Sequence, residues 1–157
     1  MRERPPLRIA VCGAGICGDD LMELADEVGR RLAEAGAILI CGGLGGVMEG
    51  SARGAHRAGG LTVGLLPGRD DRNANPYIRV PLPTAMGEGR NVLVARTAHA
   101  VIAIGGEWGT LSEVALARKV GVAVVLLRPG LTSGLDLPVA DTAEEAVRIA
   151  LDAATRA

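Results

Sequence analysis

The chain of 157 residues has almost no aromatic side chains: it contains no phenylalanine, one tyrosine and one tryptophan. Proteins that bind single-stranded nucleic acid stack its bases on aromatic rings. A net charge of −1 with no basic block also leaves nothing to attract polyanions. We therefore expect neither nucleic acid nor an acidic membrane surface as a partner.

Long hydrophobic runs are missing as well. Apolar residues make up 48% of the chain, yet no run approaches the roughly 18 residues of a membrane span. Residues 1–6 are charged and then proline-bearing, and they lack the apolar stretch of a secretory signal. We expect a cytoplasmic protein that forms a single domain over residues 1–157, because this length suffices for one core.

Metal ligands are few. The sequence has two histidines and three cysteines, Cys12, Cys17 and Cys41. An odd cysteine count in a cytoplasmic protein indicates free thiols, and a tetrahedral zinc site needs a denser cluster of ligands. We expect no metal, and we expect Cys12 and Cys41 to act as small apolar residues that end buried strands.

Short apolar runs alternate with segments of helical periodicity along the chain. They predict strands at residues 7–12, 37–41, 61–66, 77–82, 99–104 and 122–127, and helices near 19–35, 47–58, 87–98 and 110–120. Asp19 or Asp20 is the expected cap of the first helix, and residues 141–144 resemble a capping box that opens a last one. This order predicts an α/β fold, a three-layer, Rossmann-like, doubly wound parallel sheet.

Three glycine-rich turns follow predicted strands, at the edge of the sheet where such folds bind ligands. The first, residues 13–18, is a G-x-G-x-x-G turn in which Gly13 and Gly15 are the candidate contacts. A dinucleotide site also needs an acidic residue at the end of the second strand. That strand ends in Cys41, so the sequence argues against an ordinary NAD-dependent dehydrogenase.

The second turn lacks the Lys-Ser/Thr pair of a Walker A loop. It contains four candidate residues, Gly42, Gly43, Gly45 and Gly46. So many glycines are costly in conformational entropy if they only make a turn. Tight packing of strand against helix is one explanation. We favour a close approach of the backbone to a phosphate group.

The third turn joins a buried strand to the start of a helix, an arrangement that favours anions. Its candidate residues are Gly105, Gly106, Trp108, Gly109 and Thr110. Thr110 and Glu113 also fit a capping box, which would give Glu113 a purely structural role. Trp108 either lines a pocket or packs against a partner subunit, and with Tyr77 it is one of two aromatic rings on which a base can stack.

Taken together, these segments resemble the LOG-like ("lysine decarboxylase-like") Rossmann family, and most closely its molybdenum cofactor carrier branch. The resemblance runs from residue 9 to about residue 127 and is carried by residues 42–50, 64–68, 89–91 and 105–113. The phosphoribohydrolases of this family have Pro-Gly-Gly-x-Gly-Thr-x-x-Glu and an upstream Met-x-x-Arg-Lys. Here Ile104 replaces the proline and Asn91 replaces the lysine.

The resemblance implies roles at the matching positions. Arg90 would bind and orient ribose or phosphate, Glu113 would act on the ribose, and Gly106, Gly109 and Thr110 would hold a 5′-phosphate. It also implies a homo-oligomer, a dimer or larger, in which the helix at residues 87–98 supplies an interface. No resident cofactor is required, and the molybdenum cofactor is one ligand to be carried.

Two functions follow. The first is a carrier or sensor that binds a phosphorylated small molecule, either a nucleoside monophosphate or a cofactor of the molybdopterin type. The alternative is a phosphoribohydrolase that splits a nucleoside 5′-monophosphate into free base and ribose 5-phosphate, with Arg90 and Glu113 as its catalytic residues. Because Ile104 and Asn91 depart from the hydrolase motifs, we favour the first.

Overall fold

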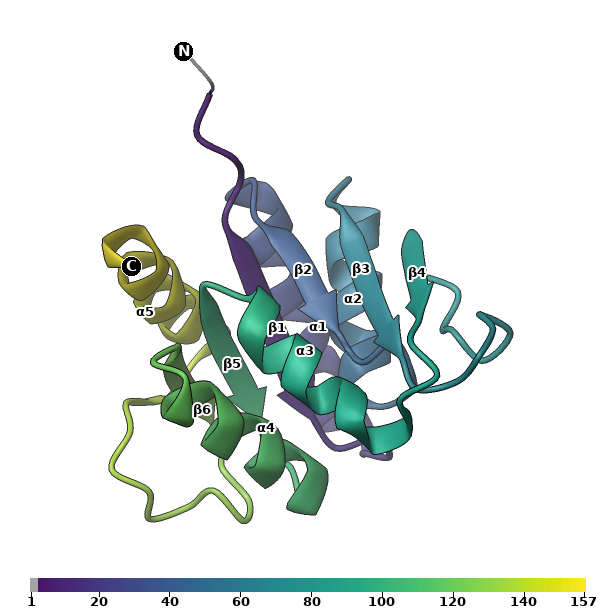
Figure 1. The fold of residues 1–157 in the computed structure, drawn as a ribbon. Helices are drawn as coiled ribbons and strands as arrows, with labels where there is room; N and C mark the ends of the chain where they lie inside the picture. The colour runs from purple at the N-terminus through teal and green to yellow at the C-terminus, as the bar shows by residue number, and fades with distance from the viewer. Residues whose placement is uncertain (1–2) are drawn as a thin grey trace.

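Seven parallel strands form one sheet in the order β4-β3-β2-β1-β5-β6-β7 in the computed structural model, which describes residues 3–157 (Figure 1). The strands are β1 (Arg8–Gly13), β2 (Ile38–Cys41), β3 (Thr62–Leu66), β4 (Val80–Pro83), β5 (Ala100–Ile104), β6 (Ala123–Leu127) and β7 (Val139–Ala140). The helices are α1 (Asp19–Glu34), α2 (Val47–Arg57), α3 (Asn91–Thr97), α4 (Trp108–Lys119) and α5 (Ala143–Arg156), with a 3₁₀ turn, η1 (Gly87–Arg90), before α3.

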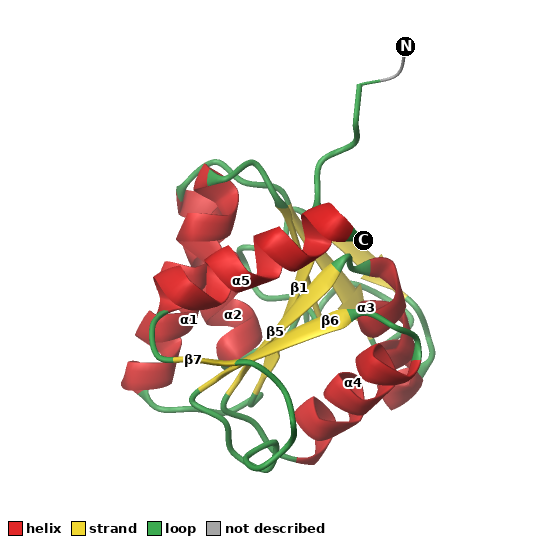
Figure 2. Ribbon diagram, turned by 90° about the vertical axis from the view of Figure 1, so that its left-hand side faces the viewer, coloured by secondary structure: helices red, strands yellow, loops and turns green. Residues whose placement is uncertain are grey.

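Helices cover both faces of the sheet, as Figure 2 shows. On one face α1, α2 and α5 pack on alternate strand residues such as Ile9, Val11 and Ile102. On the other face α3 and α4 pack on the residues between them, such as Ala10, Val101 and Ala103. Both faces of the central strands are therefore buried, and the predicted three-layer, doubly wound α/β fold is confirmed.

The order of the strands fixes where a ligand can bind. The chain runs outward from β1 to β4 and then crosses back to β5, which pairs with β1 from Ile9 opposite Ala100 to Gly13 opposite Ile104. The loops after β1 and β5 therefore diverge at the carboxyl edge and leave a crevice between them. No helix within residues 3–157 is long and apolar enough to cross a membrane.

Several predicted elements differ in extent from the observed ones. The fourth strand begins at Val80 rather than residue 77, because Tyr77 lies in a turn whose carbonyl accepts a hydrogen bond from the Thr62 hydroxyl (2.6 Å). The helix expected at residues 87–98 is split into η1 and α3. The buried side of α3 is formed by Asn91, Val94 and Ala95. The two-residue strand β7 was not expected.

The observed N-caps of α1, α4 and α5 differ from those that the sequence suggested. Gly18, not an aspartate, is the N-cap of α1, and Asp19 and Asp20 lie in its first turn. The N-cap of α4 is Glu107, so Thr110 lies inside the helix and forms no capping box with Glu113. The N-cap of α5 is Thr142, one residue after Asp141, where the predicted capping box of residues 141–144 begins. The Thr142 side chain accepts a hydrogen bond from the Glu145 N–H at 3.1 Å.

Candidate functional site

A cavity of about 760 Å³ opens at the carboxyl edge of the sheet, between the loops that follow β1 and β5. Its volume lies in the usual range for a small-molecule site. We call it the Arg90 cavity. It is lined by Gly13, Gly15, Leu44, Met48, Pro67, Glu88, Gly89, Arg90, Asn91, Val92, Trp108, Gly109, Thr110, Ser112, Glu113 and Leu116.

Arg90 is the one buried cation among the described residues, at 8% exposed. Its Nη1 donates to the Asn91 side-chain oxygen and its Nη2 to the Gly42 carbonyl (3.4 Å), while its buried Nε has no partner. It forms no ion pair with any residue that the structure describes. Burying a charge without a countercharge is expensive. The cavity is thus built around a cation that forms no ion pair among the described residues, although the Glu113 carboxyl on the same wall lies within range of its charge.

The guanidinium of Arg90 fits in place because residue 42 has no side chain. A Cβ at Gly42 would lie 2.7 Å from Nη2 of Arg90 and 2.7 Å from the sulfur of Met48. Gly42 therefore serves the site by making room for Arg90, and it does not itself line the cavity.

Asn91 connects Arg90 to helix α4. Its side-chain oxygen accepts from Arg90, its amide donates to the Ser112 hydroxyl (3.3 Å), and Ser112 donates to the Gly109 carbonyl (2.7 Å). Since Asn91 is itself buried, this chain of hydrogen bonds holds the guanidinium in a fixed position relative to the first turn of α4.

The first turn of α4 faces the cavity with free backbone donors. Among the described residues, Leu111 is the first in this helix whose N–H reaches a carbonyl, that of Glu107 at 2.9 Å. The first turn of α4 also has no acidic side chain, whereas α1 has two and α2 has one. Its positive end is therefore not neutralised from within the helix, and an anion bound beside Arg90 meets both charges.

Glu113 lies on the same wall, one turn further along α4. Burial raises the pKa of its carboxyl from an ordinary value of 4.5 to about 7, and the nearby Arg90 charge opposes that rise. The side chain is therefore partly protonated at neutral pH. A carboxyl in this state both donates and accepts a proton, and it repels a neighbouring phosphate less than a full carboxylate does.

The structure brings together seven of the thirteen residues proposed from the sequence. Gly13, Gly15, Arg90, Trp108, Gly109, Thr110 and Glu113 line the Arg90 cavity. Thr110 is buried, and Trp108 stands at the rim with 74% of its surface exposed. Gly105 and Gly106 lie behind this wall with positive φ angles, and the loop after β6 packs against them through the bond from the Leu131 N–H to the Gly106 carbonyl (3.2 Å).

The glycines of the second turn are placed differently from our expectation. Gly42, Gly43, Gly45 and Gly46 do not line the cavity; within their turn only Leu44 does. Gly46 has a φ of +65°, and a Cβ there would lie 2.1 Å from the Ala14 carbonyl oxygen. The second turn thus packs directly on the first turn, a close contact between two turns rather than between a strand and a helix.

Asn91, Ser112, Leu44 and Met48 are cavity residues that sequence reasoning missed. Asn91 carried the only usable signal, because it follows Arg90 directly and replaces the lysine of the hydrolase motif. Burial raises the pKa of the Cys12 thiol, and it raises that of Cys41 to about 12, so both behave as the expected inert, apolar residues. Residues 3–157 contain no cluster of side chains that could hold a metal ion.

Comparison with known proteins places the chain among relatives of similar length. The family model described as "SLOG cluster4 family" matches residues 6–155. The chain belongs to this family. The resemblance to LOG-like proteins near the molybdenum cofactor carriers is thereby confirmed.

One relative and two solved structures are similar over nearly the whole chain. An uncharacterized protein of Archaeoglobus fulgidus is 41% identical over 96% of this chain and 98% of its own. The molybdenum cofactor binding protein of Rippkaea orientalis is 30% identical, with a TM-score of 0.89 over 96% of this chain and 98% of that one. The molybdenum cofactor carrier protein of Chlamydomonas reinhardtii is 31% identical, with a TM-score of 0.87 over 98% and 100%.

Proposed function

We propose that this protein binds a phosphorylated small molecule in the Arg90 cavity and carries or senses it without converting it. The observation that supports this proposal is the buried Arg90, which lacks an ionic partner among the described residues and shares its cavity with the free N–H groups of α4. A guanidinium group binds phosphate oxygens through two parallel hydrogen bonds, and a helix N-terminus binds them through its free N–H groups and its dipole.

Two classes of ligand are consistent with this site: nucleoside monophosphates and cofactors of the molybdopterin type. Similarity to a molybdenum cofactor binding protein and a molybdenum cofactor carrier protein favours the second class. The residues present suit the phosphate of such a cofactor, since Arg90 has an unused Nε. The cofactor would be the molecule that the protein carries, not a group that it uses in a reaction.

The proposal is tested by thermal unfolding of the purified protein in the presence of nucleoside monophosphates and molybdopterin, followed by product analysis. A ligand at a hundredfold excess over its Kd stabilises the folded state by about 2.7 kcal/mol. We expect stabilisation by at least one phosphorylated ligand and no product. If none of the ligands shifts the unfolding temperature, the proposal is wrong.

Hydrolysis of a nucleoside 5′-monophosphate is the second candidate, and the position of Glu113 favours it. Cleavage of an N-glycosidic bond builds positive charge on the sugar, which a nearby carboxylate stabilises. If this reaction occurs, ribose 5-phosphate accumulates with the wild-type protein. Glu113→Gln then loses turnover and keeps its affinity for the substrate, whereas a carrier has no turnover to lose.

We also propose that the protein works in the cytoplasm as a homo-oligomer. Its three cysteines are free thiols. Val92 and Leu93 on α3 are only partly buried. Leu82 and Met86, which precede α3 in the chain, are more than two-fifths exposed. Burying these apolar side chains against a second copy is favourable. Light scattering of the purified protein tests this, and a monomeric mass at micromolar concentration contradicts it.

A further inference from the structure

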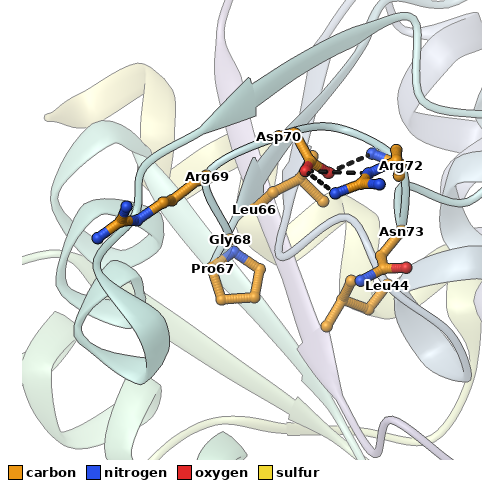
Figure 3. A pocket seen from close by; sticks show the side chains of 8 residues that line it. All are labelled: Leu44, Leu66, Pro67, Gly68, Arg69, Asp70, Arg72 and Asn73. Atoms are coloured by element: carbon orange, nitrogen blue, oxygen red, sulfur yellow. Dashed lines mark hydrogen bonds and ion pairs between the residues drawn. The ribbon is translucent and has the colours of Figure 1, made fainter.

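A second cavity, of about 480 Å³, adjoins the first and shares Leu44 and Pro67 with it. We call it the Asn73 cavity. It is lined by Leu44, Leu66, Pro67, Gly68, Arg69, Asp70, Arg72 and Asn73, which Figure 3 shows. Most of these residues belong to the extended loop at residues 68–76. This loop contributes no helix or strand to the fold and no residue to the lining of the Arg90 cavity.

The glycine-rich second turn builds the wall between the two cavities. Asn75, which is buried, fastens the loop to this turn: its backbone N–H donates to the Gly43 carbonyl (2.9 Å) and its side-chain amide to the Leu44 carbonyl (2.9 Å). The φ of +79° at Gly43 sets the direction of these carbonyls. Leu44 is thereby held at the boundary, where its side chain lines both cavities.

The lining of the Asn73 cavity suits a flat heterocyclic ring. Leu44, Leu66 and Pro67 supply an apolar surface, and the loop supplies a polar rim. Within that rim Arg72 is occupied by Asp70, which accepts two bonds from its guanidinium at 2.7 and 3.0 Å. The side chain of Asn73 makes no hydrogen bond with the described residues, and an amide offers both donors and an acceptor to a ring edge.

The aromatic side chains are poorer platforms for a ring. Tyr77 already packs against His56, with ring centroids 6.1 Å apart, and against the Arg57 guanidinium. It does not line either cavity. Trp108 lies at the open rim of the Arg90 cavity, 74% exposed. A ring stacked there is covered by protein on one side only.

We propose that the ligand spans both cavities, with its phosphate at Arg90 and its heterocyclic ring in the Asn73 cavity, where Asn73 reads the ring edge. This inference rests on the proposed function, since it assumes that a phosphate binds at Arg90. It assigns the choice among bases or pterins to residues 68–73, which the phosphate site does not use.

The test compares ligands with and without a ring. Calorimetric titrations with ribose 5-phosphate, GMP, AMP and CMP give, for each nucleotide, a ring preference: the Kd of ribose 5-phosphate divided by that of the nucleotide. We expect a preference of at least tenfold for one base. Asn73→Ala should lower it at least fivefold and leave the affinity for ribose 5-phosphate within twofold. Leu44→Ala, which removes one of the two side chains that both cavities share, should lower the ring preference as well.

Asp71→Ala is the matched control. Asp71 is exposed in the same loop and lines neither cavity, so the substitution should leave all affinities unchanged. Thermal unfolding of each variant checks that the fold is intact.

The two proposals fail in different ways. If ribose 5-phosphate, the nucleotides and molybdopterin all fail to bind, the phosphate site itself is wrong. If molybdopterin alone binds, Asn73→Ala should raise its Kd at least fivefold, and an unchanged Kd overturns the inference. If they bind but no base is preferred, or if Asn73→Ala and Leu44→Ala keep the preference, the Asn73 cavity does not hold the ring. Loss of the preference in Trp108→Ala, with its retention in Asn73→Ala, would place the ring on Trp108 and overturn the inference.

Discussion

The proposed phosphate site depends most on two neighbouring residues, Arg90 and Asn91. Asn91 accepts a hydrogen bond from the guanidinium without neutralising it, so the charge of Arg90 stays available for a ligand. An aspartate at this position would keep the hydrogen bond and add the missing countercharge. Arg90 would then form an internal ion pair, and its charge would no longer be available to a ligand.

Asn91→Asp should therefore separate ligand binding from stability. We expect at least a tenfold loss of affinity for phosphorylated ligands, because an internal carboxylate competes for Arg90. The free energy of unfolding should stay within about 1 kcal/mol of wild type, since the hydrogen bond survives. Calorimetric titration and urea unfolding measure the two quantities. Ser112→Ala breaks the link to α4 and leaves Arg90 its hydrogen bond to Asn91, so it measures how much of the loss comes from that link alone. We expect a smaller loss of affinity than in Asn91→Asp. Unchanged ligand affinity in Asn91→Asp contradicts this assignment.

Glu113 should make the protein less stable as the pH rises. Its pKa is about 7 in the folded state and lower when the chain unfolds, so between about pH 4.5 and 7 the folded state holds more protons. Stability contributed by this carboxyl is therefore fully present below pH 4.5 and is lost as the pH rises through 7. The cause is burial, which disfavours the ionised form.

Replacing Glu113 with glutamine removes this titration. The advantage in unfolding free energy of Glu113→Gln over wild type should grow between pH 5 and pH 8 and level off above. Urea unfolding at four pH values measures it, and a difference that does not change with pH shows that the carboxyl is not desolvated as described.

At the scale of elements, the turns after β1, β2 and β5 have different tasks although all are rich in glycine. The first and third turns contribute lining to the Arg90 cavity, and the second supports the first turn and the loop at residues 68–76. The sequence shows the glycines but not what lies against each. Gly46 and Ala14 are 32 positions apart in the chain and touch only in the fold.

Gly46→Ala and Gly109→Ala should behave in opposite ways. At Gly46 the φ angle is +65° and a Cβ would meet the Ala14 carbonyl, so we expect a loss of more than about 2 kcal/mol of stability. At Gly109 a Cβ meets nothing within 4 Å, and alanine favours a helix by about 1 kcal/mol over glycine. That variant should be as stable as wild type or more so. Denaturant unfolding compares them, and equal effects contradict the division of tasks.

The fold class and most of its strands and helices were predictable from the sequence, and the site only in part. Buried parallel strands appear as continuous apolar runs such as residues 100–104, and glycine turns mark their carboxyl ends, so both the layers and the edge that carries the site follow from the pattern. The start of α4 at Trp108 did not follow, because its N-cap, Glu107, makes no side-chain capping bond. The burial of Arg90 was hidden because its partner Gly42 lies 48 positions earlier.

The most direct test of the central claim is a calorimetric titration of wild type and Arg90→Met with GMP, AMP and molybdopterin, each beside its dephosphorylated counterpart. We predict that in wild type at least one phosphorylated ligand binds tenfold or more tightly than its counterpart, and that this difference disappears in Arg90→Met. If phosphate adds nothing to affinity in wild type, or if its contribution survives the loss of Arg90, the cavity is not a phosphate site.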